Sequence, residues 1–401
     1  MKNSGFWVKL CVFNFFIVSF IGVMMRYGMA FSLPGISHTF MQESHSHFAF
    51  YGWVSAAIYI FVVRYLSEHI NKINIRKYEI LMTFNQFGSY GMLFSFLYGG
   101  YFWLSIVFSS VVLFTGFAYF IFLMMDTKIS REPEVIWLKA GAFFAVFSSI
   151  GIFGLAYFSG RKEEFDMLFR ASAYFYLHYQ YNGFFMFSCI GLFLTVLKKY
   201  KICIPRELNR NIFYLMFTSC LFGYGLSVLW IEMEDIWRIF FSFISILQVL
   251  GMMKLLVWSK KANVFKSQDF IKKILLSFSG LAFFLKCVLQ TLSTVTALGT
   301  IVFSNINIVI AYLHLVLLMG VSLFLIWMIV GLYTGKISKM LKKNIIMLIS
   351  GIVLNEIILV SAGTLSAFYI PFPYASFVLL FASVMIMLSI ASFLKEIIPA
   401  S

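Results

Sequence analysis

Twelve apolar stretches of about 20 residues follow one another along the chain, separated by short polar loops. A stretch of about 20 apolar residues crosses the hydrocarbon core of a bilayer as an α-helix. In chain order the stretches cover residues 7–29, 46–66, 79–99, 102–125, 136–159, 171–197, 211–230, 237–258, 271–293, 304–333, 343–366 and 374–395. This pattern predicts an all-α fold, a polytopic membrane helix bundle of about 12 transmembrane helices, with the lipid bilayer as its surrounding partner.

The composition leaves little room for anything else. Of the 401 residues, 61% are hydrophobic and only 12% are charged, which is more apolar surface than a soluble domain can bury. The stretches and their loops use nearly the whole chain, so we expect one integral-membrane domain over residues 1–401. Stretch one is too long for a typical signal peptide, and Arg26 near its outer end is unlike a cleavage site, so we expect a retained helix.

The Lys and Arg residues lie almost entirely in alternate loops. Apart from Lys286, which lies inside stretch nine, 25 basic residues lie on one predicted side of the membrane and 5 on the other. Because Lys and Arg concentrate in cytoplasmic loops, we expect a multi-pass protein of the bacterial inner membrane with both termini in the cytoplasm. This bias accounts for most of the net charge of +15, so no nucleic-acid partner is expected.

The five cysteines are scattered along the chain. They are Cys11, Cys189, Cys203, Cys220 and Cys287. Four of them lie inside apolar stretches, and no CxxC or CxxCH motif is present. A disulfide framework, a zinc knuckle and covalent attachment of haem are therefore not expected.

Histidines inside the apolar stretches are the strongest functional signal, because an ionisable side chain in lipid is costly. His45 and His47 lie within a turn of the outer end of stretch two. His178 lies about six residues into stretch six, and His314 about ten residues into stretch ten. All three stretches run inward, so these histidines share the outer half of the membrane. Imidazole binds iron, copper and zinc, carboxylates are scarce in this layer, and we expect haem iron.

His45 and His47 cannot bind one atom from a regular helix, because two residues rotate a side chain by about 200°. Either they serve two sites, or His45 precedes the helix and lies at the membrane surface. Each could also simply reach water at the interface. Gly52 further along would let a flat ring or a neighbouring helix come close.

Tyr181 and Asn182 share the helical face of His178, because they follow it by three and four residues. We expect these three residues to line an interior polar pocket, together with Tyr312 of stretch ten. The cluster suits a metal ligand with hydrogen-bonding neighbours, or an interhelical network without a cofactor. His314 is isolated, and a lone membrane histidine can also serve only as a structural hydrogen bonder.

Two further ionisable residues lie within the stretches. Lys286 lies in the middle of stretch nine, and Glu356 in stretch eleven, where we expect it nearer the cytoplasmic half. Both are candidates for a proton path. The alternatives are a buried pair or a lysine that reaches the interface.

Together these features resemble a known family. Twelve helices with histidines on helices two, six and ten are similar to the catalytic subunit of haem-copper oxidases and nitric oxide reductases. The segment His178-x-x-x-Asn182-Gly-Phe-Phe is similar in spacing to helix six of nitric oxide reductases, with Asn182 where those carry glutamate. His45-Ser46-His47 followed by Gly-Trp-Val is similar to a run that the family has on helix ten, here on helix two.

The resemblance implies a membrane haem protein with an oxidase-like or nitric-oxide-handling role, and leaves copper or non-haem iron open as a second metal. His314 would match the ligand of the low-spin haem, and the predicted partner is His47, with His45 the next to test. Arg26 and Arg170 would meet the haem propionates. The family's histidine pair on helix seven is missing from 211–230, and Tyr312 stands where the high-spin haem ligand would be.

The expected activity is electron transfer, or binding or reduction of a small gas, which makes the chain a candidate oxidoreductase without assigned catalytic residues. An electron donor or other membrane subunits are the expected partners. A multi-span transporter or metal permease could use the same histidines for a substrate in transit. A cofactor-free assembly subunit could use them to bridge helices.

Overall fold

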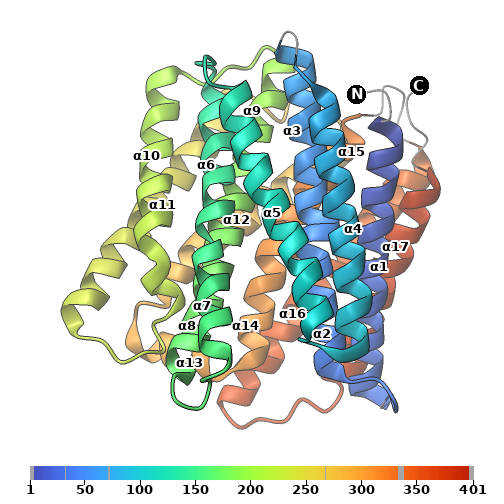
Figure 1. The fold of residues 1–401 in the computed structure, drawn as a ribbon, viewed down its shortest axis with the longest axis vertical. Coiled ribbons are helices and arrows are strands. Elements are labelled where there is room, and N and C mark those ends of the chain that lie inside the picture. Colours follow the sequence, from blue (N-terminus) through green and yellow to red (C-terminus); the bar gives the residue numbers. More distant parts are fainter. Residues whose placement is uncertain (1–3, 32, 71–72, 267, 333–337, 397–401) are drawn as a thin grey trace. The chain divides into compact units, whose positions relative to one another are not determined.

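The computed structural model describes residues 4–31, 33–70, 73–266, 268–332 and 338–396 (Figure 1). Every regular element in this part of the chain is a helix, as predicted. Ten described helices are long and apolar enough to cross a membrane, which confirms a polytopic helical membrane protein. They are Ser4–Phe31, His38–His69, Trp103–Asp126, Pro133–Ser159, Asp166–Lys199, Asp235–Lys261, Phe270–Leu292, Ile306–Val330, Lys339–Ala367 and Ala375–Glu396.

The two other predicted stretches, 79–99 and 211–230, also form helices, but these helices are weaker candidates for crossing a membrane. In place of 79–99 the chain forms α4 (Ile75–Gly99), which buries the polar side chains of Asn85 and Gln86. In place of 211–230 it forms α10 (Arg206–Phe222), which has only 17 residues and a charged first turn. Both helices are therefore shorter or more polar than a span that faces lipid alone.

Three of the crossings change from α-helix to π-helix and back. A π turn holds more residues than an α turn, and such turns are frequent at functional sites. The first crossing runs through α2 (His38–Phe48), η1 (Ala49–Ser55) and α3 (Ala56–His69). The second runs through α8 (Asp166–His178), η2 (Tyr179–Phe185) and α9 (Met186–Lys199). The third runs through α14 (Ile306–His314), η4 (Leu315–Ser322) and α15 (Leu323–Val330).

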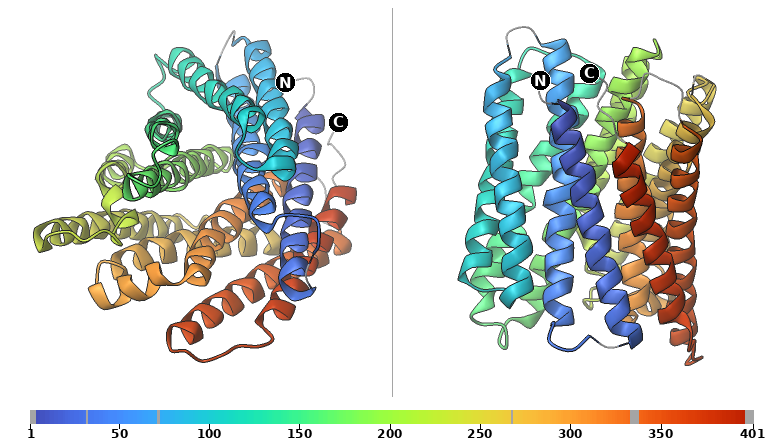
Figure 2. Two further views of the ribbon diagram at one scale, coloured as in Figure 1. Left: turned by 60° about the horizontal axis from the view of Figure 1, so that its bottom comes forward. Right: turned by 90° about the vertical axis from the view of Figure 1, so that its right-hand side faces the viewer.

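The chain forms two compact units. The first contains residues up to 118, 274–276 and from 322 onward. In it, α1 (Ser4–Phe31) contacts both α17 (Ala375–Glu396) and the α2–η1–α3 helix, so the first and last described helices lie side by side (Figure 2). Along this core, α16 (Lys339–Ala367) packs against α17, and α4 packs against α2 and α3.

The second unit contains residues 119–273 and 277–321. In it, α6 contacts η2 and α9, α7 packs along α8, and α10 packs along α11, while the short turn η3 contacts α8, α10 and α11. A short helix, α13, precedes α14 where the sequence predicts a loop. The remaining bounds are α5 (Trp103–Asp126), α6 (Pro133–Phe147), α7 (Ser149–Ser159), η3 (Gly223–Ser227), α11 (Asp235–Lys261), α12 (Phe270–Leu292) and α13 (Thr296–Ser304).

Buried polar side chains bind backbone carbonyls of the π turns. In η1, the Asn14 amide donates to the Gly52 carbonyl at 2.6 Å and the Asn85 amide to the Tyr51 carbonyl at 3.0 Å. In η4, the Ser279 hydroxyl donates to the Gly320 carbonyl at 2.7 Å. A π turn interrupts the regular α-helical ladder, and inside a membrane the released carbonyls need protein donors. Contacts from neighbouring helices therefore stabilise these turns.

Candidate functional site

The three crossings with a π turn each carry a histidine within two residues before that turn. His178 and His314 are the last residues of α8 and α14, and His47 is the last but one of α2. At 1.5 Å per residue, His47 lies about 14 Å from the start of its helix, His178 about 18 Å and His314 about 12 Å. The same arrangement thus occurs three times, which the sequence analysis did not recognise.

His45 and His47 lie further from the start of their helix than expected. Stretch two was expected to begin at residue 46, but its helix begins at His38. The reason is a polar first turn, in which the Ser37 hydroxyl accepts from the Phe40 amide and caps the helix. His45 therefore does not precede the helix, and His38 is helical rather than in a loop.

His45 and His47 point to different neighbours, as their spacing predicts. The Nδ1 atom of His45 lies 3.0 Å from the Val18 carbonyl oxygen on α1. The ring of His47 stacks on Phe96 of α4 at 4.5 Å, and its Nε2 atom lies 2.8 Å from the Tyr101 hydroxyl. The two imidazoles cannot serve one metal ion.

Hydrogen bonds distinguish the proton positions of these histidines. A carbonyl oxygen only accepts, so the Nδ1 atom of His45 must carry a proton, and in the neutral ring Nε2 then carries the lone pair. The Nδ1 atom of His314 likewise lies 3.0 Å from the Ile310 carbonyl oxygen. Donation from one ring nitrogen to a carbonyl is the usual arrangement of a metal-binding histidine, because it orients the ring and raises its basicity.

His178 has the opposite arrangement. Its Nε2 atom lies 2.9 Å from the Cys220 carbonyl oxygen and must carry the proton. The lone pair on Nδ1 then accepts from the Ser227 hydroxyl at 3.0 Å and from the Asn182 amide at 3.1 Å. Both ring nitrogens are therefore engaged, which matches the interhelical network considered above rather than a metal ligand.

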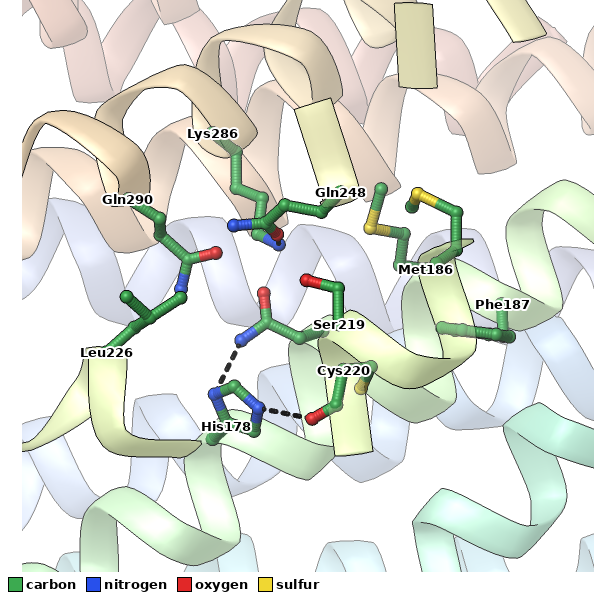
Figure 3. Close-up of a pocket in the computed structure, with 11 residues that line it drawn as sticks. His178, Met186, Phe187, Ser219, Cys220, Leu226, Gln248, Lys286 and Gln290 are labelled. Atoms are coloured by element: carbon green, nitrogen blue, oxygen red, sulfur yellow. Dashed lines mark hydrogen bonds between the residues drawn. The ribbon is translucent and has the colours of Figure 1, made fainter. Parts of the chain in front are cut away.

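His178 and Asn182 line a small polar cavity between α10, α11 and α12 (Figure 3). On its far side from His178, the Lys286 ammonium donates to the Gln248 side-chain oxygen at 2.9 Å. Lys286 is 2% exposed, so it does not reach the interface. Sequence reasoning singled out Lys286 and Asn182 separately, but it missed Gln248 of stretch eight and Gln290, which follows Lys286 by four residues in stretch nine.

The two tyrosines predicted beside the site lie close together. The rings of Tyr181 and Tyr312 are 6.1 Å apart and meet edge to face. Tyr181 is buried, but it does not line the cavity with His178 and Asn182. Of the four residues expected in the polar pocket, His178 and Asn182 line this cavity, and Tyr181 and Tyr312 do not.

Arg26 and Arg170, the predicted partners of the haem propionates, have different surroundings. Arg170 forms an ion pair with Asp166 at 2.7 Å and lies over the Trp230 ring at 5.0 Å, so its guanidinium is engaged locally. Arg26 donates only a long bond of 3.7 Å to the Met29 sulfur and interacts electrostatically with His45 and Glu356. Glu356 lies nearer the end of α16 at Ala367, which is the predicted outer end, than its start at Lys339, which is the predicted cytoplasmic end.

Gly52 does not leave open room for a flat ring. A Cβ atom at Gly52 would meet the Phe48 ring at 2.7 Å, so the phenyl ring of its own helix covers that face. Room beside the His45 ring comes instead from Gly22. A Cβ atom at Gly22 of α1 would lie 3.4 Å from the His45 ring, so the glycine lets α1 approach this imidazole.

A metal site built from protein ligands alone does not form among the described residues, where no three His, Cys, Asp or Glu side chains gather. Axial ligation of haem needs only one or two histidines, and His45 and His314 have the required proton position. The predicted pairing of His47 with His314 joins residues of the two separate units and stays a prediction.

No protein-family model matches the chain, and no curated protein is significantly similar to it. The resemblance to haem-copper oxidases therefore rests on the histidine motifs.

Proposed function

We propose that the protein is a membrane haem protein with an oxidase-like or nitric-oxide-handling role, in which His45 and His314 are the axial-ligand candidates. The observation behind the choice of His45 over His47 is the bond from its Nδ1 atom to the Val18 carbonyl. That bond leaves the lone pair on Nε2, while the Nε2 atom of His47 faces the Tyr101 hydroxyl. A haem held by both histidines would supply one-electron chemistry, and a haem held by only one of them could also bind a small gas.

The surroundings of His45 support this proposal. Arg26, which lies near it, provides a guanidinium suited to a propionate. Arg170 is a poorer candidate for that role, because Asp166 already accepts from it. Gly22 keeps the α1 backbone close to the imidazole without a side chain between them.

The orientation of the chain is part of the same proposal. The bias of 25 basic residues against 5 supports a bacterial inner-membrane location with both termini in the cytoplasm. The histidines then lie in the outer half of the bilayer. An electron donor on the outer side or within the membrane would reach them over the shortest path.

The absorption spectrum of the purified protein tests the proposal. We expect a Soret band, and we expect His45→Ala and His314→Ala each to abolish the low-spin spectrum. His47→Ala is the matched control, because it changes an imidazole two residues away on the same helix and should keep the spectrum. A colourless protein after expression with haem supplied would contradict the proposal. A spectrum lost in His47→Ala but kept in His45→Ala would assign His47 instead.

A further inference from the structure

The cavity between His178 and Lys286 contains a buried lysine without an acidic partner among the described residues, which is unusual for a membrane interior. Lys286 is almost fully buried, and in the described chain no carboxylate forms an ion pair with it. Its ammonium donates to a neutral amide oxygen of Gln248. A buried ammonium is costly unless polar groups surround it, so the groups lining this cavity have to solvate it.

Two polar atoms at the cavity have no partner of their own. The Nε2 atom of Gln248 is a buried donor without an acceptor, and the Oδ1 atom of Asn182 is a buried acceptor without a donor. Both side chains line the cavity, and both are at least nine-tenths buried. Buried polar atoms in native proteins are nearly always satisfied by protein or by ordered water, so these two atoms point to a ligand that both accepts and donates.

The size of the cavity limits that ligand. Its volume is about 10 Å3, which is about the smallest that holds one water molecule. Water can accept from Gln248 and Lys286 and donate to Asn182. The Ser219 hydroxyl, which donates to the Ile244 carbonyl, keeps lone pairs for a further bond. One water therefore satisfies both unpartnered atoms.

The same groups are poorly suited to a metal cation. The lone pair of His178 is already used by Ser227 and Asn182. The described lining offers one imidazole, His178, one thiol, Cys220, and the thioethers of Met186 and Met216 as soft donors, but no carboxylate. Its other oxygen donors are neutral amides and a hydroxyl, which bind transition metals weakly. The Lys286 ammonium would repel a cation held in the same small cavity.

We propose that this cavity binds one water molecule and no metal ion, and that Lys286 provides the positive charge on which its polar walls are organised. The inference does not require bound haem. Where the proposed haem function holds, the inference narrows it, because His178 would then not hold the second metal of a binuclear centre.

A double-mutant cycle tests the water. No direct bond joins Lys286 to Asn182, so a water bridge is what couples them. We expect the fall in Tm of Lys286→Met with Asn182→Leu to be smaller than the sum of the two single falls. The control pairs Lys286→Met with Ser245→Ala, a buried hydroxyl of α11 that bonds the Ser242 carbonyl, and should be additive. Additive losses in the first pair would overturn the bridge.

Metal analysis of the same proteins tests the second half of the proposal. The purified chain is incubated with copper or zinc, freed of unbound metal, and its metal content is measured. We expect His178→Ala and Cys220→Ala to leave the non-haem metal content unchanged. A bound metal that either variant loses would overturn the proposal. Haem content is measured separately, so a colourless protein would contradict the proposed function without changing either readout.

Discussion

The Trp53 indole donates a hydrogen bond of 2.9 Å to the Ser322 hydroxyl. The two residues are 269 positions apart in sequence and both are buried. Trp53 lies in η1, and Ser322 is the last residue of η4. Phe15 of α1 stacks on the indole at 4.6 Å and fixes the plane of its ring. Within the first unit, this bond therefore connects η1 to the last residue of η4.

Trp53→Phe should keep the stacking on Phe15 but remove the hydrogen bond. We expect a loss of about 1 kcal/mol in the free energy of unfolding, the usual size for one hydrogen bond in a membrane protein. Unfolding in mixed detergent micelles measures it. In the cycle with Ser322→Ala, the double variant should lose less than the two single variants combined. Equal and additive losses would show that the bond contributes nothing.

Hydropathy predicted the helices well because it depends on how many apolar residues fit across a bilayer. It placed a stretch at all ten apolar helices of the described chain. Helix geometry, in turn, predicted that His45 and His47 face different neighbours, as they do. Hydropathy missed the beginning of α2 at His38, because the capped turns that precede the apolar run are polar. It also counted α4 and α10 with the other crossings, although buried polar or charged turns set them apart.

The π turns and the cavity could not be predicted in the same way. A π turn changes the backbone hydrogen bonds, and the donors that bind its carbonyls, such as Asn14 and Ser279, lie on other helices. The cavity joins side chains that the sequence separates by more than 100 residues, from His178 to Lys286. The proton positions of His45 and His178 depend on which backbone carbonyl each imidazole contacts in the fold. The sequence alone does not identify that carbonyl.

Asn14 should be among the most sensitive polar residues of the first unit. Its amide donates to the Gly52 carbonyl and to Gln86 at 2.8 Å, and its oxygen accepts from the Tyr90 hydroxyl at 2.6 Å. Asn14→Leu leaves several buried groups without partners, so we expect a loss of about 2–4 kcal/mol. Tyr90→Phe removes only one of these bonds and should cost less. Thermal unfolding in detergent compares them, and an equal loss in both would contradict this network.

Reporter fusions test the predicted orientation. A fusion after Glu164 should read as periplasmic, and one after Lys261 as cytoplasmic, because basic residues concentrate on one side of the membrane. An alkaline phosphatase and a fluorescent protein at each position give opposite signals and control for expression. The reverse pattern would place the histidines in the cytoplasmic half of the membrane and would contradict the orientation given in the proposed function.

Gly183 and Gly320 form a matched pair for testing how tightly the π turns are packed. A Cβ atom at Gly183 of η2 would lie 2.4 Å from the Phe144 Cβ atom, next to the backbone of α6, where a side chain cannot swing away. A Cβ atom at Gly320 of η4 would lie 3.2 Å from the edge of the Phe283 ring, which can shift slightly.

We therefore expect Gly183→Ala to cost about 1–3 kcal/mol of stability by overpacking, and Gly320→Ala to cost clearly less. Thermal unfolding of both variants in one detergent measures the difference. Because Phe144 meets the added methyl through its Cβ atom, Phe144→Leu should not rescue Gly183→Ala. A rescue, or an equal loss in both glycine variants, would show that η2 and α6 can separate where the close approach of their backbones predicts a fixed contact.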